Sequence, residues 1–104
     1  MVTREDLSPG QQAVQAAHAA IDFCYEHPDR AGPWHKDSNY LVLLSVKNEK
    51  QLYLLISKCF ELGLKFTAFK EPDIGNQVTA VAIEPGEVTQ KLVQKIPLLF
   101  TNKN

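Results

Sequence analysis

The feature that most constrains the fold is an almost unbroken apolar run at residues 40–46, which reads YLVLLSV and lies between two stretches with helical periodicity. Such a run is typical of a strand that is covered on both faces. Strands that alternate with helices need crossover connections, and crossovers join parallel strands. The run therefore predicts an α/β fold in which helices cover both faces of a sheet.

The first helical stretch has clear start signals. Ser8 can cap the helix, Pro9 suits its first turn, and Gln11 completes the spacing of a capping box. We expect this helix to end near Glu26. Its sheet-facing side is predicted to consist of the apolar residues that recur at helical spacing, namely Val14, Ala17, Ile21, Cys24 and Tyr25.

The second helical stretch begins and ends with similar signals. Asn48 and Gln51 have the spacing of a capping box, and Gly63 stands where a glycine commonly ends a helix. The predicted buried stripe of this helix consists of Leu52, Leu55, Ile56, Cys59 and Leu62.

The rest of the chain supplies short strands and a third helix. We predict strands at residues 1–4, 65–69 and 77–83, a loop at 27–39, a helix at 87–96 and a final packed segment at 98–100. The order β-α-β-α-β-β-α predicts a three-layer α/β/α architecture with a mixed four-stranded sheet, whose last two strands are antiparallel neighbours. The first strand is so short that we expect it to leave an open sheet edge.

Composition limits the classes of function. A chain of 104 residues with 44% hydrophobic and 22% charged residues fits one soluble domain, which we expect to span residues 1–104. No apolar run reaches the ~20 residues of a membrane helix, and the charged first residues do not resemble a secretory signal. We therefore expect no membrane association and a cytoplasmic location. Cys24 and Cys59 fall on predicted apolar helix faces and are expected to be buried free thiols.

The net charge and the absence of known motifs exclude further classes of function. The formal net charge is −1, whereas proteins that bind duplex nucleic acid usually carry a basic stripe. Any contact with nucleic acid should therefore be small, such as one exposed end of an RNA. The chain has no metal-ligand spacing, P-loop, dinucleotide fingerprint or GxSxG elbow. We accordingly expect neither a metal nor a nucleotide cofactor.

Polar residues on the first helix stand in places that the fold does not require. Gln11, Gln15, His18 and Asp22 line up along one side of this helix. The free N–H groups of a helix start also favour a bound anion. A histidine at the boundary of the core is the alternative interpretation of His18.

Two further polar features follow in the second half of the chain. The loop at residues 71–77 contains Glu71, Asp73 and Asn76, and Pro72 and Gly75 restrict its backbone. A carboxylate on such a loop is well placed to orient a histidine or a water, although turn chemistry alone also explains these residues. Thr79 is polar within an otherwise apolar strand, where β-propensity is the alternative explanation.

Several motifs together resemble the second (bacterial/archaeal-type) peptidyl-tRNA hydrolase family. REDL at residues 4–7 leads through Gly10 to QAAHAA at 15–20, as an R-x-D-L strand end leads there to a helix with A-A-Q-x-S-H-A. LGL at 62–64, the acidic loop and TAVAIEP at 79–85 resemble that family's L-G-L, D-A-G-R-T and T-V-L-G-I-G-P. The matches occur in the same order along nearly the whole chain.

The resemblance implies a hydrolase that cleaves the ester between a peptide and the 3′ ribose of tRNA. It places the family's histidine on His18, its glutamine on Gln15 and its strand threonine on Thr79. A water positioned by His18 and an acidic partner would attack the ester carbonyl, and nearby amides or N–H groups would stabilise the oxyanion. The partner would be the 3′ end of tRNA, and the resemblance also suggests a homodimer.

The chain departs from the family pattern at two cations. The family's lysine near the helix start is Gln11 here, and the arginine of its D-A-G-R-T loop is missing. Counting after Leu64 assigns the family's aspartate to Glu71, whereas the glycine two residues later assigns it to Asp73. Two alternatives to the tRNA hydrolase remain open, namely a non-catalytic binding or regulatory module on the same fold and a hydrolase of a small ester or amide.

Overall fold

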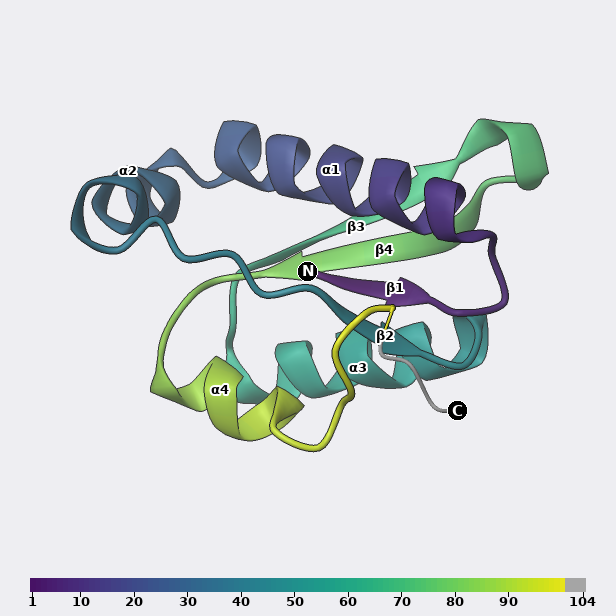
Figure 1. The fold of residues 1–104 in the computed structure, drawn as a ribbon. Coiled ribbons are helices and arrows are strands. Elements are labelled where there is room, and N and C mark those ends of the chain that lie inside the picture. The colour runs from purple at the N-terminus through teal and green to yellow at the C-terminus, as the bar shows by residue number, and fades with distance from the viewer. Residues whose placement is uncertain (101–104) are drawn as a thin grey trace.

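A four-stranded mixed sheet lies between two layers of helices (Figure 1). The structure is a computed structural model that describes residues 1–100. The strands are β1 (Val2–Arg4), β2 (Leu44–Val46), β3 (Phe66–Glu71) and β4 (Gln77–Ile83). The helices are α1 (Pro9–Glu26), α2 (Pro28–Asp37), α3 (Glu49–Leu62) and α4 (Glu87–Val93), with a short 3₁₀ helix η1 (Pro72–Ile74). Helices α1 and α2 lie on one side of the sheet and α3 and α4 on the other, which confirms the predicted three-layer α/β/α architecture.

The strand order in the sheet is β2-β1-β4-β3. Strand β1 runs parallel to β2 and antiparallel to β4, and β3 and β4 are antiparallel neighbours. The predicted mixed sheet and its antiparallel last pair are therefore confirmed. The expected open edge at the first strand is wrong, because β1 is paired on both sides and the edges are formed by β2 and β3.

Helix α1 begins as predicted but faces the sheet with a different side. Ser8 and Gln11 form the complete capping box, with side-chain to backbone distances of 3.2 and 3.1 Å. The predicted apolar face is wrong, since Ile21 is 67% and Tyr25 87% exposed. The sheet-facing residues are instead Gln12, Gln15, Ala16, Ala19 and Phe23.

Two physical reasons explain this orientation of α1. Ala16 and Ala19 are small, so the helix axis can lie close to the sheet. Each buried glutamine is hydrogen-bonded to a threonine hydroxyl of the sheet, so its amide is not left unpaired. As a consequence Cys24 is exposed, and the expectation that both thiols are buried holds only for Cys59.

Helix α3 packs as its sequence predicts. Asn48 caps its start, and Gly63 ends it with φ 68°, a left-handed conformation that favours glycine. Leu52, Leu55 and Cys59 are buried, in agreement with the predicted stripe. They cover the face of the sheet that is formed by Val2, Leu44, Val78 and Val81. Leu62 at the predicted end of the stripe is exposed.

The segment between α1 and β2 differs from its prediction. The expected loop at residues 27–39 contains α2, which starts with Pro28 in its first turn and Asp29 at the positive end of the helix dipole. The guanidinium of Arg30 holds α2 to Glu84 at 3.3 Å. The expected strand at residues 40–46 is confirmed only for Leu44–Val46, because its partner β1 is itself only three residues long.

The last described residues follow β4 onto the α3 side. Helix α4 ends at Val93, earlier than predicted, and Val88 in its first turn is exposed. Leu92 does pack against the core. Leu98 forms an isolated antiparallel bridge with Leu44, so the predicted final segment contacts the β2 edge of the sheet. No helix within residues 1–100 is long and apolar enough to cross a membrane.

Candidate functional site

Thr79 is an extra residue in β4 and turns its side chain towards α1. Phe69 of β3 pairs with Ala80 and Lys70 pairs with Val78, so Thr79 has no partner across the strands. A β-bulge of this kind changes the direction in which a strand side chain points. The hydroxyl of Thr79, which is fully buried, donates a hydrogen bond of 2.6 Å to Oε1 of Gln15.

A chain of hydrogen bonds continues from Gln15 to the loop after β3. Gln15 is only 6% exposed, and its Nε2 donates to Oε1 of Glu71 at 2.9 Å. The other carboxylate oxygen of Glu71 accepts the backbone N–H of Asp73 at 3.2 Å. These two bonds, followed by the nearby His18, hold the pKa of Glu71 below its ordinary value. Glu71 is therefore a carboxylate that is fixed in place and ionised at neutral pH.

His18 lies one helical turn after Gln15 on an exposed part of α1. Its imidazole is stacked on the ring of Phe69, with the ring centroids 4.5 Å apart and the planes within 5°. It makes no hydrogen bond to another described residue, so both ring nitrogens are free to contact a ligand or a water. The alternative interpretation of His18, a histidine at the boundary of the core, agrees with its packing on Phe69. This packing leaves both ring nitrogens free to react.

A hollow of about 310 Å³ opens beside these residues. It lies between the start of α1 and the segment β3-η1-β4, and it is lined by Leu7, Gly10, Gln11, Val14, Gln15, Glu71, Asp73, Ile74 and Thr79. The structure thus brings five predicted residues together around the hollow, namely Gln11, Gln15, Glu71, Asp73 and Thr79, whereas His18 does not line it. Asn76 does not line the hollow. Its backbone N–H closes the turn onto the carbonyl of Glu71 at 2.9 Å, and its φ of 60° fits a turn residue.

The turn that leads into α1 is held by Arg4. The guanidinium binds both carboxylate oxygens of Asp6 at 2.9 and 2.8 Å and also donates to Gln77 and to the carbonyl of Val78. The bidentate pair with Asp6 holds the turn after β1, and the bonds to Gln77 and Val78 connect the end of β1 with the start of β4. The R-x-D motif therefore fixes the position of the α1 N-terminus relative to the sheet.

Comparison with known proteins places the chain in a family. The model of the family described as "Peptidyl-tRNA hydrolase PTH2" matches residues 1–99. The chain belongs to this family. Among curated relatives, a protein named "Peptidyl-tRNA hydrolase" from Thermococcus sibiricus is 26% identical over 95% of this chain and 94% of its own length. A protein of the same name from Thermococcus onnurineus is 27% identical over 92% of this chain and 88% of its own length.

As a member of the peptidyl-tRNA hydrolase family, the chain has an unusual residue at the start of α1. Gln11 stands where the resemblance places a lysine, and its Oε1 is held by the backbone N–H of Ser8 in the capping box. Gln11 is among the residues that line the hollow, and its Nε2 makes no hydrogen bond to another described residue. The position thus offers an uncharged donor instead of a cation.

Sequence reasoning missed two other features next to the candidate site. Gln12 accepts a hydrogen bond from Thr3 at 3.1 Å and donates to the carbonyl of Leu7, forming a second glutamine–threonine pair beside the first. Phe69 supplies the surface on which His18 stacks. Gln12 could have been identified from the sequence. The signal was the spacing of the two glutamines on α1, together with one threonine on each central strand.

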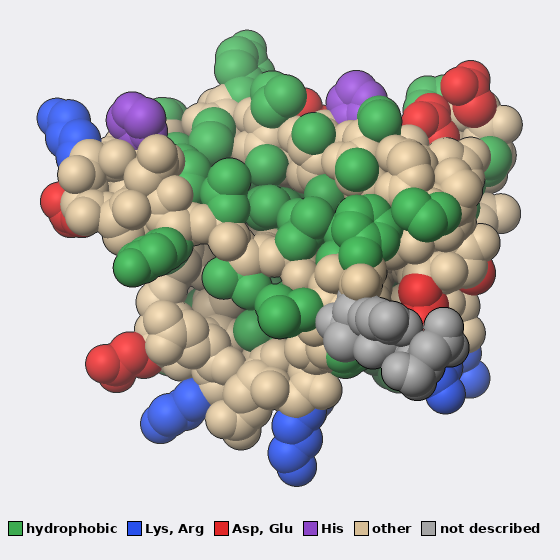
Figure 2. Space-filling view, in the orientation of Figure 1, with side chains coloured by type: hydrophobic (Ala, Val, Ile, Leu, Met, Phe, Trp, Pro, Cys, Tyr) green, Lys and Arg blue, Asp and Glu red, His purple; other side chains and the backbone are tan. Residues whose placement is uncertain are grey.

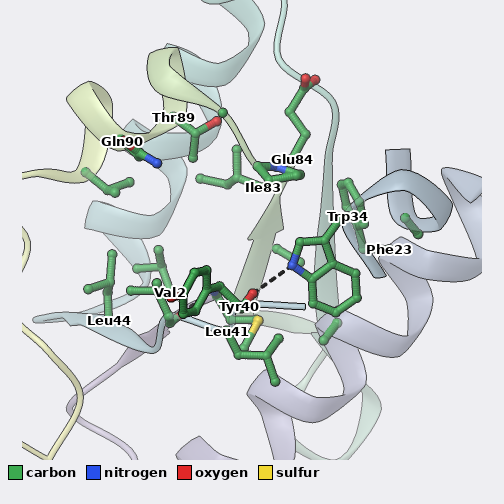
Figure 3. A pocket seen from close by; sticks show the side chains of 18 of the residues that line it. Val2, Phe23, Trp34, Tyr40, Leu41, Leu44, Ile83, Glu84, Thr89 and Gln90 are labelled. Atoms are coloured by element: carbon green, nitrogen blue, oxygen red, sulfur yellow. Dashed lines mark hydrogen bonds between the residues drawn. The ribbon is translucent and has the colours of Figure 1, made fainter. Parts of the chain in front are cut away.

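A second hollow, of about 200 Å³, lies at the opposite end of the sheet (Figure 3). Trp34 of α2 lies over it and donates from Nε1 to the carbonyl of Tyr40 at 2.7 Å. The walls are mainly apolar, and none of the site residues predicted from the sequence lines it. Within residues 1–100, no group of three or more His, Cys, Asp or Glu side chains is placed to hold a metal ion.

Proposed function

We propose that this chain cleaves the ester between a peptide, or an N-blocked aminoacyl group, and the 3′ ribose of tRNA. The observation that carries the proposal is the hydrogen-bonded chain from Thr79 through Gln15 to Glu71, with His18 next to it. The proposal is supported by the resemblance, which implies site roles for His18, Gln15 and Thr79, and by the hydrogen bonds that join Gln15 to Thr79 and Glu71. The arrangement provides a fixed carboxylate, an accessible imidazole and a hollow for the reacting group.

In the proposed reaction, His18 and Glu71 position a water at the ester carbonyl. The imidazole of His18 takes the proton as the water attacks, and the negative charge of Glu71 stabilises the imidazolium that forms. The Nε2 of Gln11 is the proposed donor for the oxyanion, because Gln11 lines the hollow and this nitrogen has no partner among the described residues. Gln15 and Thr79 act as positioning residues that hold Glu71.

We assign the acidic role to Glu71 and not to Asp73. The carboxylate of Glu71 is bonded to Gln15, whereas Asp73 contributes its backbone N–H to that carboxylate. Asp73 remains at the exposed side of the hollow. Asn76 has a turn role in this proposal and no contact with the reacting group.

The proposed partner is the 3′ end of tRNA, in the cytoplasm where translation takes place. The net charge is −1 and the site lies near one end of the sheet. Both features suit contact with the 3′ terminus of an RNA better than contact with a nucleic-acid duplex. We also propose that residues 1–104 form one domain, as the family match over residues 1–99 supports.

A homodimer is the proposed assembly. Figure 2 shows hydrophobic side chains gathered along α1 and across the middle of the same face. Exposed apolar side chains of α1 include Ile21 and Tyr25, and those of the segment before β2 include Tyr40, Leu41 and Val42. A contiguous apolar surface of this kind is typical of a protein–protein interface.

The test is release of labelled N-acetyl-aminoacyl groups from tRNA by the purified protein, beside His18→Ala. We expect release by the parent and a loss of at least about a hundredfold in His18→Ala, with an unchanged circular dichroism spectrum because His18 is exposed. Full turnover by His18→Ala would contradict the site. Absence of release by both proteins, with both folded, would favour the non-catalytic module on this fold. Release that does not weaken with rising salt would favour a small ester as substrate.

A further inference from the structure

Glu49 joins the first turn of α3 to the start of β4. Its Oε2 accepts the backbone N–H of Val78 at 2.8 Å, and its side chain is partly buried. Helix α3 covers the face of the sheet opposite α1, and it begins at the end of the sheet where β4 starts (Figure 1). Glu49 therefore contacts the strand that carries Thr79 from the side that does not hold the candidate site.

The backbone of Val78 is held by side chains because β1 ends too early to pair with it. The register between β1 and β4 ends with Thr3 opposite Ala80. Glu49 accepts the N–H of Val78, and the guanidinium of Arg4 donates to its carbonyl at 3.2 Å. Backbone polar groups that are buried without a partner are costly. The two side chains thus take the place of a strand partner at this point of β4.

Val78 comes directly before the bulge. In a regular strand, residues two positions apart share one face of the sheet. Val78 lies in the core beneath α3, whereas Ala80 packs against Ala19 of α1, so the alternation is broken at Thr79. If the extra residue were Val78, Thr79 would oppose Lys70 and face α3, away from α1. The position of the bulge therefore decides whether the hydroxyl of Thr79 reaches α1.

The two hydrogen bonds hold the backbone on both sides of Val78. The N–H that Glu49 accepts belongs to the peptide unit before Val78, and the carbonyl that Arg4 binds belongs to the unit that leads to Thr79. The pKa of Arg4 is raised, first by its hydrogen bond to Asp6 and in smaller part by the charge of Glu49. Opposite charges thus keep the two side chains next to the same residue.

We propose that Glu49 is a positioning residue for the candidate site, which keeps the bulge at Thr79 by holding the N–H of Val78. The inference rests on the proposed function, because Thr79 orients Gln15 and Gln15 holds the carboxylate of Glu71. Glu49 does not line the hollow and acts only through the backbone of β4. The N–H of Val78 needs an acceptor and not a negative charge, so a glutamine side chain can replace Glu49.

The kinetic experiment is the tRNA release assay with two variants of Glu49. Glu49→Ala removes the acceptor and should lower kcat about tenfold, with KM within about twofold, because Glu71 is less well positioned. Glu49→Gln keeps an acceptor and should restore kcat to within about twofold of the parent. Glu61→Ala is the matched control, since Glu61 is exposed near the end of α3 and pairs only with Lys58 among the described residues.

Three kinetic outcomes would overturn the inference. The first is an unchanged kcat in Glu49→Ala. The second is a loss in Glu49→Gln as large as that in Glu49→Ala, which would mean that the charge and not the acceptor matters. The third is an equal loss in Glu61→Ala. If Glu49→Ala does not fold, Glu49→Leu removes the acceptor, keeps most of the side-chain volume and carries the same expectations.

An NMR titration separates this inference from the proposed function. The pKa of Glu71 is held below its ordinary value chiefly by the hydrogen bond from Gln15, so it reports whether Gln15 is in place. Followed through the side-chain carboxyl carbon, this pKa should rise towards 4.5 in Glu49→Ala and stay low in Glu49→Gln and Glu61→Ala. The rise is expected even if the parent releases nothing from tRNA, in which case only the proposed function fails. An identical titration of Glu71 in Glu49→Ala and the parent would overturn the inference whatever the release assay shows.

Discussion

The hydroxyl of Thr79 donates to the side-chain carbonyl of Gln15 at 2.6 Å, and both groups are buried. The contact exists because the bulge in β4 leaves Thr79 unpaired and turns it to α1, while Gln15 faces the sheet on α1. This hydrogen bond thus fixes the position of α1, which carries His18, relative to β4, which follows the acidic loop.

Replacing this hydroxyl should reduce both stability and hydrolysis. Thr79→Val keeps the shape of the side chain but leaves Oε1 of Gln15 without its donor, which should lower the free energy of unfolding by about 1–2 kcal/mol. Gln15 would also be less well placed to hold Glu71, so kcat should fall by about tenfold or more. Urea unfolding and the tRNA release assay measure the two effects.

The neighbouring pair provides the control for that experiment. Thr3→Val removes the equivalent bond to Gln12, which lies one turn earlier on α1 and does not line the hollow. It should destabilise the fold by a similar amount and leave kcat within about twofold. Equal loss of hydrolysis in both variants would mean that the effect comes from stability and not from the position of Gln15.

The stack between His18 and Phe69 leads to a second prediction. Phe69→Leu removes the flat surface under the imidazole and should lower kcat about tenfold, because His18 gains other orientations. Phe69→Tyr keeps the ring and should restore most of the rate. Phe23→Leu is the control, since Phe23 lies in the same apolar cluster as Phe69 but beside His27. Loss of rate in Phe23→Leu equal to that in Phe69→Leu would argue against a role for the stack.

Local signals along the chain predicted most of the architecture. The capping box at Ser8 and the left-handed end of α3 at Gly63 depend on interactions within a few residues, and both are confirmed. The order of strands and helices was also predictable, because short and long connections restrict how strands pair. Burial on α1 was not predictable in this way. Apolar periodicity favoured Ile21 and Tyr25, whereas the structure buries two glutamines whose threonine partners are distant in sequence.

The candidate site was predicted in its residues but not in its geometry. Motifs singled out His18, Gln15 and Thr79 and left Glu71 and Asp73 as alternatives, and the structure bonds Gln15 to both Thr79 and Glu71. Their assembly depends on the bulge at Thr79, which cannot be inferred from a strand sequence that alternates normally. The helix α2 was missed because its proline and glycine content resembles a loop, and its contacts are tertiary.

Acid unfolding provides a third prediction. The pKa of Glu71 lies below its ordinary value of 4.5, mainly because of the hydrogen bond from Gln15. A carboxyl with a lowered pKa in the folded state stabilises the fold above its unfolded pKa, and this contribution is lost as the pH falls through the folded pKa. In Glu71→Gln, the stability should therefore decline less steeply below about pH 4.5 than in the parent. Urea midpoints between pH 3 and 6 measure the difference, and parallel curves would contradict the lowered pKa.

The two thiols should differ in reactivity, which tests the orientation of α1. Cys24 is exposed, whereas Cys59 is buried under the sheet and its pKa is raised to about 11 by burial and by the charge of Glu84. A disulfide reagent at pH 8 should label one thiol per folded chain quickly and the second only in denaturant. Cys24→Ser should abolish the fast reaction. Protection of both thiols would instead support the apolar helix face predicted from the sequence.

If the chain forms the proposed homodimer, a charged residue introduced on α1 should lower the molecular mass measured in solution. Ile21 is 67% exposed on the apolar face of α1 and lies outside the hollow beside Glu71. Ile21→Glu should convert a dimer of the parent into a monomer, because an interface buries a carboxylate only at a high desolvation cost. Leu54→Glu is the control, since Leu54 is similarly exposed on α3 in the opposite helix layer. Light scattering after size exclusion should give twice the chain mass for the parent and for Leu54→Glu. A parent that elutes as a monomer at the same micromolar concentration would exclude the dimer, and a dimer that survives in Ile21→Glu would place its interface on another face.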